Sequence, residues 1–317
     1  MDYLTLLSPR HDWTKAEIMV LFNQSLMELL FQAHQVHRHY FDPHKIQKSK
    51  NFSIKTGMCP EDCKYCSQSG HYKTEIERHQ LLSKDQILLE AAKAKANGAE
   101  RFCMGAAWRS PPEKEMPKLV EIIKAVNELG LETCATLGML TQEQANILAD
   151  AGLAYYNHNL DTSPEHYEKI VTTRTYQDRL DTIACVRQAG MKVCCGGILG
   201  LGETREDRAG LLHQLATLSP HPESIPLNHL IKISGTPLEN VESVSILEWI
   251  RTIAVARILM PKSFVRLSAG RHELSEEAQT LAFFAGANSI FVGNKLLTAA
   301  NPDYCDDETL LEQLGLC

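Results

Sequence analysis

Residues 101–137, RFCMGAAWRSPPEKEMPKLVEIIKAVNELGLETCATL, contain the pattern that predicts the fold. Two short runs typical of β-strands, 101–106 and 132–137, flank a helical stretch that begins near Glu115 and reaches Gly130. Glycine often follows the last turn of a helix, because it adopts the left-handed backbone conformation without strain. A strand, a helix and a second strand in this order form the unit from which parallel sheets are built.

The same alternation of strand and helix continues along the chain. The expected strands are 52–55, 101–106, 132–137, 155–161, 192–199, 224–231, 264–269 and 289–292. Helices are expected to begin near Ser83, Glu115, Thr141, Tyr176, Thr204, Ser245, Ser275 and Asp306. Ser83 with Gln86, and Thr141 with Gln144, match the capping box of a helix N-terminus. This order predicts an α/β fold, a (β/α)8 TIM-type barrel, and the alternative is an open, doubly wound sheet.

An N-terminal helical extension is expected before the barrel. Residues 14–40 have apolar side chains at helical spacing, and Asp42-Pro43 would end the helix. We therefore predict a helical extension over residues 1–50, the barrel over 51–300 and a C-terminal helical tail over 301–317. No change of composition separates these parts, which favours a single domain.

Composition excludes some classes of protein. A net charge of −7 over 317 residues argues against a general nucleic-acid binder, which is usually basic. No apolar run is long enough to span a bilayer, and residues 1–10 lack the pattern of a secretory signal. We therefore expect no membrane or nucleic-acid partner and a cytoplasmic location. In that compartment, ten cysteines indicate metal binding or thiol chemistry rather than disulfides.

The alternation of side chains along the strands predicts a polar barrel interior. With the more apolar face of each strand turned outward to the helices, the expected inward residues are Cys103, Cys134, Thr136, Asn157, Asn159, Asp161, Cys194, Ile198, Asn228, Arg266 and Ser268. The expected outward residues include Phe102, Met104, Ala135, Tyr156, His158, Leu160, Val193, Cys195, Ile225, Leu227, Ile231, Val265 and Leu267. A barrel that is only structural fills its interior with Val, Ile and Leu. Buried polar groups without partners are costly, so this lining predicts a ligand-filled cavity.

Residues 59–66, CPEDCKYC, carry the sharpest chemical signal. Cys59, Cys63 and Cys66 follow the first strand and offer three thiolates to the irons of a cubane cluster. Closed zinc and iron–sulfur sites normally have four protein ligands, so a three-ligand set leaves one iron open. The alternative is a structural zinc knuckle with a distant fourth ligand.

This cysteine spacing resembles that of the radical S-adenosylmethionine superfamily. The resemblance implies a 4Fe–4S cluster whose open iron is chelated by S-adenosylmethionine. It also implies cleavage of that molecule to methionine and a 5′-deoxyadenosyl radical, which abstracts hydrogen from an unactivated carbon. Tyr65 matches the aromatic position near the adenine, although plain loop packing is an alternative role for it.

Further motifs are similar to those of the biotin synthase family within that superfamily. They are FSIKTG at 52–57, RFCMGAAW at 101–108, YYNHNLDT at 155–162 and VRLSAGR at 265–271. The resemblance covers nearly the whole chain and implies a second cluster, a 2Fe–2S centre, with ligands Cys103, Cys134, Cys194 and Arg266. These four residues also belong to the set that strand alternation turns inward. The remaining cysteines are predicted to have no chemical role. Cys185 and Cys195 are expected to be packing residues, and Cys305 and Cys317 to be incidental.

The resemblance also implies roles for individual residues. Cys59, Cys63, Cys66 and Arg266 are the expected catalytic residues. The expected contacts to S-adenosylmethionine are Tyr65, Asn159, Asp161 and Ile198, and those to dethiobiotin are Asn157, Asn159 and Asn228. Arg266 is unusual as a ligand, because a guanidinium has no free lone pair, and a salt bridge is the alternative.

The implied activity is that of a radical sulfurtransferase, the insertion of sulfur into dethiobiotin to form biotin. The 2Fe–2S cluster would donate the sulfur, and a reducing electron donor such as flavodoxin and a homodimeric state are further expectations. The alternatives within the superfamily are an isomerase resembling methylornithine synthase and a maturase of hydrogenase cofactors. A non-catalytic zinc-binding barrel is the alternative from another class.

Overall fold

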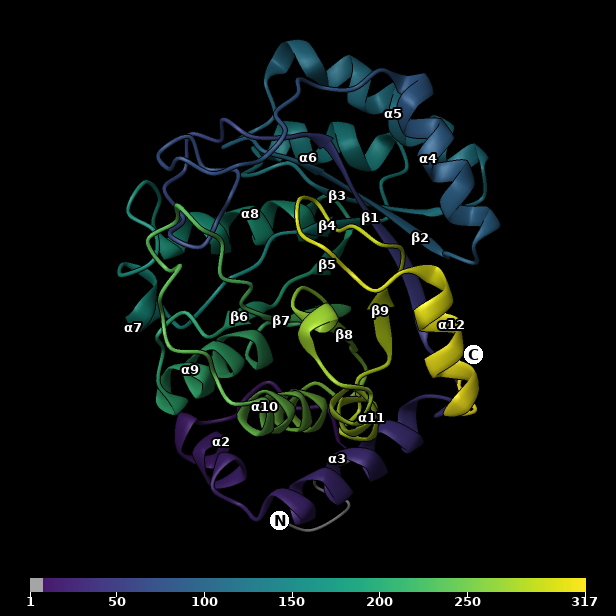
Figure 1. The fold of residues 1–317 in the computed structure, drawn as a ribbon. Coiled ribbons are helices and arrows are strands. Elements are labelled where there is room, and N and C mark those ends of the chain that lie inside the picture. The colour runs from purple at the N-terminus through teal and green to yellow at the C-terminus, as the bar shows by residue number, and fades with distance from the viewer. Residues whose placement is uncertain (1–7) are drawn as a thin grey trace.

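Short parallel strands close into a barrel in the computed structural model, which describes residues 8–317 (Figure 1). The strands are β1 Gln47–Lys55, β2 Arg101–Ala106, β3 Glu132–Thr136, β4 Tyr155–Asn157, β5 Lys192–Cys194, β6 Gly197–Leu199, β7 Ser224–His229, β8 Phe264–Leu267 and β9 Ser289–Phe291. Their order in the sheet is β5-β4-β3-β2-β1-β9-β8-β7-β6, and a further pairing of β5 with β7 closes it. The expected TIM-type barrel is confirmed, and the open doubly wound sheet is excluded.

The strand predicted over residues 192–199 is broken into β5 and β6. The break lies at Cys195 and Gly196, and a Cβ atom on Gly196 would collide with the carbonyl oxygen of Pro226. The chain must bend where β7 approaches so closely, and only glycine leaves room for that approach. Because β5 and β6 both pair with β7, they occupy one strand position in the barrel. The barrel therefore has the eight strand positions that the sequence predicts.

Strand β1 begins at Gln47, earlier than the predicted start at residue 52 and inside the range assigned to the N-terminal extension. Its first inward side chains, Gln47 and Ser49, are buried and polar, so they lack the apolar signal of a strand. They are tolerated because both accept hydrogen bonds from the guanidinium of Arg266.

The N-terminal extension consists of two helices where the sequence predicted one. These are α2 Lys15–Phe22 and α3 Leu26–Tyr40, and α2 begins with a capping box between Thr14 and Glu17. Helix α2 packs on α9, and α3 packs on α10 and α11. Both therefore lie against the outer helices of the barrel, at the lower edge of Figure 1.

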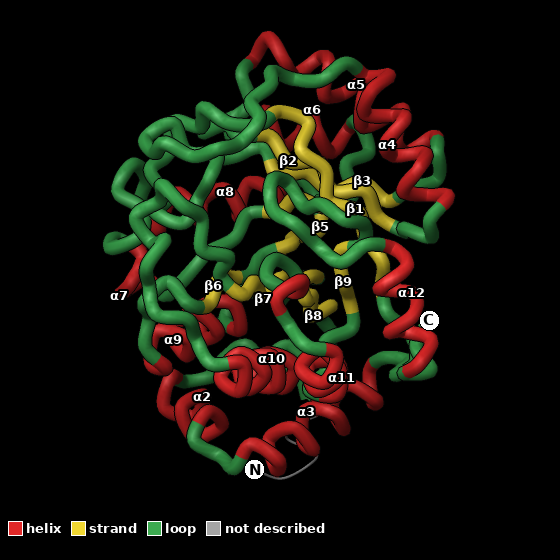
Figure 2. The backbone as a smooth tube through the Cα atoms, in the orientation of Figure 1, coloured by secondary structure: helices red, strands yellow, loops and turns green. Residues whose placement is uncertain are grey.

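The other helices surround the strands (Figure 2). They are α4 Lys84–Ala96, α5 Met116–Glu128, α6 Gln142–Asp150, α7 Pro164–Tyr167, α8 Tyr176–Gln188, α9 Arg205–Ala216, α10 Ile246–Leu259, α11 Glu276–Phe284 and α12 Tyr304–Gln313. The short 3₁₀ turns η1 Glu113–Glu115 and η2 Arg271–Glu273 precede α5 and α11. The capping boxes predicted at Ser83 and Thr141 are present.

Within residues 8–317, none of the helices combines the length and apolar character needed to cross a membrane. The expectation that residues 1–10 lack a secretory signal falls mostly on residues outside the described range.

Candidate active site in the barrel lumen

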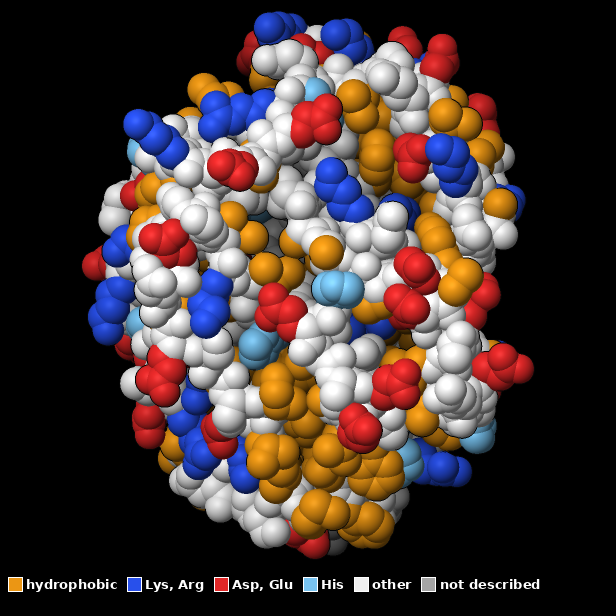
Figure 3. Space-filling model, in the orientation of Figure 1, with side chains coloured by type: hydrophobic (Ala, Val, Ile, Leu, Met, Phe, Trp, Pro, Cys, Tyr) orange, Lys and Arg blue, Asp and Glu red, His pale blue; other side chains and the backbone are white. Residues whose placement is uncertain are grey.

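A cavity of about 330 Å³ occupies the lumen at the carboxyl ends of the strands. Figure 3 shows a hollow in this face of the molecule. All eleven residues that strand alternation turned inward line the cavity. His158 and Ile231, which were predicted to face outward, also line it with some of their atoms.

The loop that follows β1 brings Cys59, Cys63 and Cys66 to the wall of this cavity. Its charged residues tie it to Arg109, which follows β2, and to the segment before α8. The buried Glu61 carboxylate accepts a hydrogen bond from Arg109 Nη1 at 2.8 Å, and another from the Thr173 hydroxyl. Asp62 accepts hydrogen bonds from the backbone N–H groups of Thr172 and Thr173. The loop is therefore held in place by its own acidic residues, which the sequence analysis did not single out.

The thiols of this loop lie in a buried environment that disfavours their ionisation. Burial raises the pKa of Cys59 and Cys63, and it raises that of Cys66 to about 12. A positive charge is close by, because Arg174 Nη2 lies 3.5 Å from Cys63 Sγ. Iron supplies the larger compensation in a cluster, since a metal-bound thiol is deprotonated.

A second set of cysteines lies deeper in the lumen. Cys103 on β2 and Cys134 on β3 are register partners, and Cys194 lies on β5. The Cys134 thiol hydrogen-bonds with both of the others. The hydrogen bond between Cys134 and Cys194 lowers the pKa of Cys194 to about 6. Together with the charge of Arg266, it outweighs the opposing effect of burial. The set is thus prepared to carry negative charge.

Arg266 on β8 completes this set as a cation without a carboxylate partner among the described residues. Its guanidinium, 1% exposed, donates to Ser289 Oγ at 2.9 Å and to the side-chain oxygens of Gln47 and Ser49 at 3.1 Å. It also stacks over the Phe291 ring at 4.7 Å. The salt bridge considered from the sequence is therefore not formed, and the charge of Arg266 instead lowers the pKa values of the Cys103 and Cys194 thiols.

The geometry of both cysteine sets bears on which metal they suit. Among residues 8–317, no three His, Cys, Asp or Glu side chains are placed to hold a single metal ion. Zinc requires its ligand atoms to converge within about 2.3 Å of one point. In an iron–sulfur cluster the thiolates bind different irons, so they can stand farther apart. Thiol donors around an open lumen fit such clusters.

Arg101, another residue that the sequence analysis did not single out, lies fully buried beside the deeper cysteines. Its guanidinium stacks on the Tyr155 ring at 3.5 Å and forms an ion pair of 2.6 Å with Glu132. Its positive charge also favours the thiolate forms of Cys103 and Cys194.

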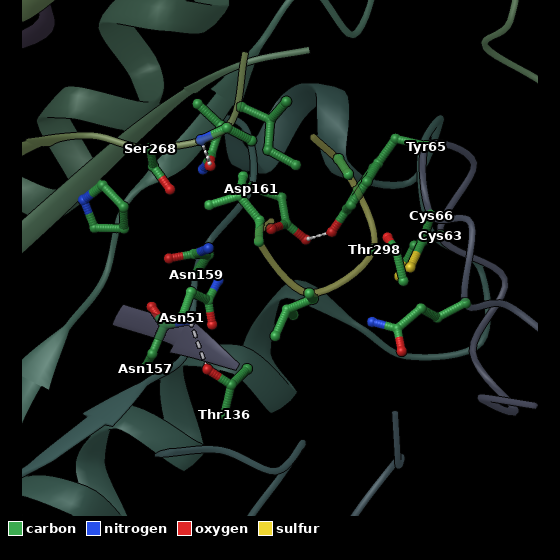
Figure 4. Close-up of a pocket in the computed structure, with 18 of the residues that line it drawn as sticks. Asn51, Cys63, Tyr65, Cys66, Thr136, Asn157, Asn159, Asp161, Ser268 and Thr298 are labelled. Atoms are coloured by element: carbon green, nitrogen blue, oxygen red, sulfur yellow. Dashed lines mark hydrogen bonds between the residues drawn. The ribbon is translucent and has the colours of Figure 1, made fainter. Parts of the chain in front are cut away.

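Asp161 lines the same cavity and is the centre of a polar cluster (Figure 4). The Tyr65 hydroxyl donates to its Oδ2 at 2.9 Å, and Arg179 forms a buried ion pair with the same oxygen. Burial and the neighbouring carboxylate raise the pKa of Tyr65, so the phenol remains a donor. Asp161 has φ of +66°, a strained conformation for a residue other than glycine. The sequence predicted Asp161 and Tyr65 here but not Arg179.

The asparagines of the lumen differ in how far the protein uses their amides. Asn157 Nδ2 donates to Thr136 Oγ1 at 2.9 Å, and Asn159 Oδ1 accepts from the Gly196 N–H at 3.1 Å. Asn228 is engaged at both ends, with Gly197 O at 2.9 Å and the Ala269 N–H at 3.0 Å. Ile198, 9% exposed, adds an apolar surface beside them.

Comparison with known proteins places the chain in a family. The model of the radical SAM superfamily matches residues 53–215, and that of the biotin and thiamin synthesis associated domain matches residues 226–317. The biotin synthase of Shewanella frigidimarina is 61% identical over 99% of this chain and 89% of its own length. That of Pseudomonas syringae pv. syringae is 60% identical over 100% and 90%. The chain belongs to the biotin synthase family.

Solved structures agree on the fold of this biotin synthase family member. Methylornithine synthase superposes with a TM-score of 0.82 at 20% identity, covering 99% of this chain and 96% of the other. The FeFe-hydrogenase maturase HydG of Carboxydothermus hydrogenoformans gives 0.83 at 17% identity, covering 99% and 77%. At such identities the likeness shows only the shared barrel.

Membership of the biotin synthase family decides among the alternatives drawn from the sequence. The isomerase and the maturase share the barrel but not the sequence, and the zinc-binding barrel is excluded by the radical SAM match. The family implies a 4Fe–4S cluster and S-adenosylmethionine, and it implies a radical sulfurtransferase of biotin synthesis.

Proposed function

We propose that the chain forms biotin from dethiobiotin by inserting a sulfur atom taken from a 2Fe–2S cluster in the barrel floor. The observation that carries the proposal is the joint placement of Cys103, Cys134, Cys194 and Arg266 on that floor. A buried guanidinium beside thiols, with no carboxylate bound to it among residues 8–317, suits an anionic group held there.

Cys59, Cys63 and Cys66 would hold the 4Fe–4S cluster, and the deeper set would hold the 2Fe–2S cluster. When bound, the first supplies the electron that cleaves S-adenosylmethionine, and the second supplies the sulfur. The contacts of Glu61 and Asp62 fix the loop that carries the outer thiols. Ser289, Gln47 and Ser49 orient the guanidinium of Arg266 toward the deeper thiols.

S-adenosylmethionine would lie beside the outer cysteines, in contact with Tyr65, Asn159, Asp161 and Ile198. A carboxylate such as Asp161 suits ribose hydroxyls, and the free amide nitrogen of Asn159 suits a carboxylate or carbonyl oxygen. The support for this placement is that all four line the cavity that both cysteine sets also line.

Dethiobiotin would lie between S-adenosylmethionine and the deeper cysteines, with its ring facing Asn157, Asn159 and Asn228. Their amides carry both donors and acceptors, as a cyclic urea does. The surrounding barrel would position the substrate carbon and exclude water and stray reductants from the radical.

We propose further that the protein acts in the cytoplasm as a homodimer and is reduced by a donor such as flavodoxin. Support for the dimer comes from exposed apolar side chains on the touching helices α3, α10 and α11, where apolar side chains gather in the lower part of Figure 3. These residues are Met27, Phe31, Leu247, Leu281 and Phe284. The division into extension 1–50, barrel 51–300 and tail 301–317 also remains a proposal.

The first test is an anaerobic count of iron and sulfide on the wild type and on Cys103→Ala, with absorption and electron paramagnetic resonance spectra. We expect two cluster types in the wild type and loss of only the smaller one in the variant. S-adenosylmethionine cleavage should persist in that variant without biotin formation. A single cubane in both proteins would contradict sulfur insertion and favour isomerase-like chemistry.

A further inference from the structure

Asn51 on β1 lines the lumen with an amide that the protein leaves free. Neither its Oδ1 nor its Nδ2 has a hydrogen-bond partner among residues 8–317, although the side chain is half-buried. The other lumen asparagines each give at least one amide atom to the protein, as described above. Asn51 is therefore the asparagine of the cavity that is least used for structure.

The position of Asn51 places this amide next to the deeper set of cysteines. In the β1–β2 register it is the partner of Cys103, so the two side chains emerge next to each other on the inward face. Two residues earlier on the same face, Ser49 holds the guanidinium of Arg266. In Figure 4, Asn51 points into the part of the cavity that Asn157 and Asn159 also face. This is where the ring of the substrate is proposed to lie.

A free amide in a half-buried position loses hydrogen bonds to water without replacing them in the protein. Such a group is retained at no net cost when a ligand supplies the missing partners. An amide is neutral and offers both a donor and an acceptor, so it complements a neutral group with the reverse pair. A cyclic urea, with ring N–H groups and a carbonyl oxygen, is such a group.

We propose that Asn51 is a specificity-determining contact, whose amide exchanges hydrogen bonds with the cyclic urea ring of dethiobiotin. The proposal rests on the function proposed above and adds a residue to the substrate contacts inferred from the sequence. Asn51 thereby favours ligands with a polar ring beside Cys103, Cys134 and Cys194.

The test measures the dissociation constant of dethiobiotin for the cluster-loaded protein with S-adenosylmethionine present and no reductant, so that no turnover occurs. Asn51→Leu keeps a similar volume and removes the amide. We expect it to weaken dethiobiotin binding about tenfold, the effect of one or two hydrogen bonds to a neutral ligand, and to leave S-adenosylmethionine binding unchanged. Asn51→Ser should shift binding in the same direction and serves if the leucine variant loads its clusters poorly.

Two controls isolate the ring contact. Phe52→Leu alters the opposite face of β1, where Phe52 packs against Phe102 outside the lumen, and should leave binding unchanged. An analogue of dethiobiotin with a cyclopentane ring in place of the urea ring should bind the wild type and Asn51→Leu equally.

Equal affinity of the wild type and both Asn51 variants for dethiobiotin would overturn the proposal. So would a change in the spectrum of the smaller cluster with unchanged affinity, because the amide would then serve the cluster. If the wild type with both clusters loaded fails to bind dethiobiotin at all, the proposed function itself falls, which is a distinguishable result.

Discussion

Arg266 shows at the scale of one residue how the lumen accommodates charge. A fully buried guanidinium is expensive unless its donors are paired and its charge is balanced. Three side-chain oxygens accept its hydrogen bonds, the Phe291 ring covers its face, and its charge in turn lowers the pKa values of the Cys103 and Cys194 thiols. A neutral residue here would remove one of the two positive charges, with that of Arg101, that favour the thiolate forms, so Arg266 and the cysteines form one unit.

Substitution of Cys194 tests this unit. We expect Cys194→Ser to retain S-adenosylmethionine cleavage and to lose biotin formation by at least about a hundredfold, because a serine hydroxyl does not ionise near neutral pH and binds iron poorly. Assays of 5′-deoxyadenosine and biotin on the same sample check both parts. Cys195→Ser is the matched control, since Cys195 is buried in the surrounding apolar core away from the lumen. Full biotin yield from Cys194→Ser would contradict the assignment of this thiol to the sulfur-donating cluster.

The positions of the helices around the barrel depend on packing that the local sequence pattern predicts only in part. Helix α3 illustrates this, because its apolar face packs on α10 and α11 with one histidine, His37, enclosed among apolar and aromatic side chains. Burial, together with the charge of Arg257, lowers the pKa of His37 to about 3. The neutral imidazole is the form that the packed helix accepts.

The stability of this packing should depend on pH. The folded-state pKa of His37 lies below its value in the unfolded chain, about 6.5, so unfolded chains take up the proton first as the pH falls. The stabilisation is complete above about pH 6.5 and should decline by up to about 1.4 kcal/mol per pH unit below it, until the folded pKa near 3. Melting temperatures between pH 7.5 and pH 5 should therefore fall less steeply in His37→Phe than in the wild type. The exposed His39→Phe variant is the control, and parallel slopes in wild type and His37→Phe would contradict the assignment.

At the scale of the whole molecule, the extension and the outer helices leave an apolar surface. Met27 and Phe31 of α3 lie with Leu247 of α10 and with Leu281 and Phe284 of α11, and these helices are in contact. Single exposed apolar residues are common, but a group on adjoining helices is typical of an interface. A symmetric dimer would cover this surface with its own copy.

We expect Phe31→Asp combined with Phe284→Asp to weaken self-association at least about tenfold, since each would bury a carboxylate in an apolar interface. Sedimentation velocity over a range of protein concentrations measures the change. Leu89→Asp is the matched control, because Leu89 is an exposed apolar residue on α4, outside this surface. A wild type that sediments as a monomer at all concentrations would contradict the proposed dimer.

Much of the candidate site could be predicted because its signals are local. The spacing of Cys59, Cys63 and Cys66 lies within one loop, and the inward orientation of Cys103 and Cys134 follows from the two-residue period of a strand. The helix starts at Ser83 and Thr141 could be predicted because a capping box is formed by residues within four positions of one another. By contrast, the ion pair of Arg179 with Asp161 was not predicted, because Arg179 lies on a helix and meets Asp161 only when the barrel is folded.

The order of strands and helices, the cysteine loop and the family could be inferred from the sequence alone, because each depends on residues that are near one another in the chain. Three features emerge only when the chain is folded: the break between β5 and β6, where Gly196 meets Pro226, the hydrogen bonds of Glu61 with Arg109 and Thr173, and the free amide of Asn51. These features depend on which distant segments become neighbours when the barrel closes, and closure is set by the packing of all the strands together.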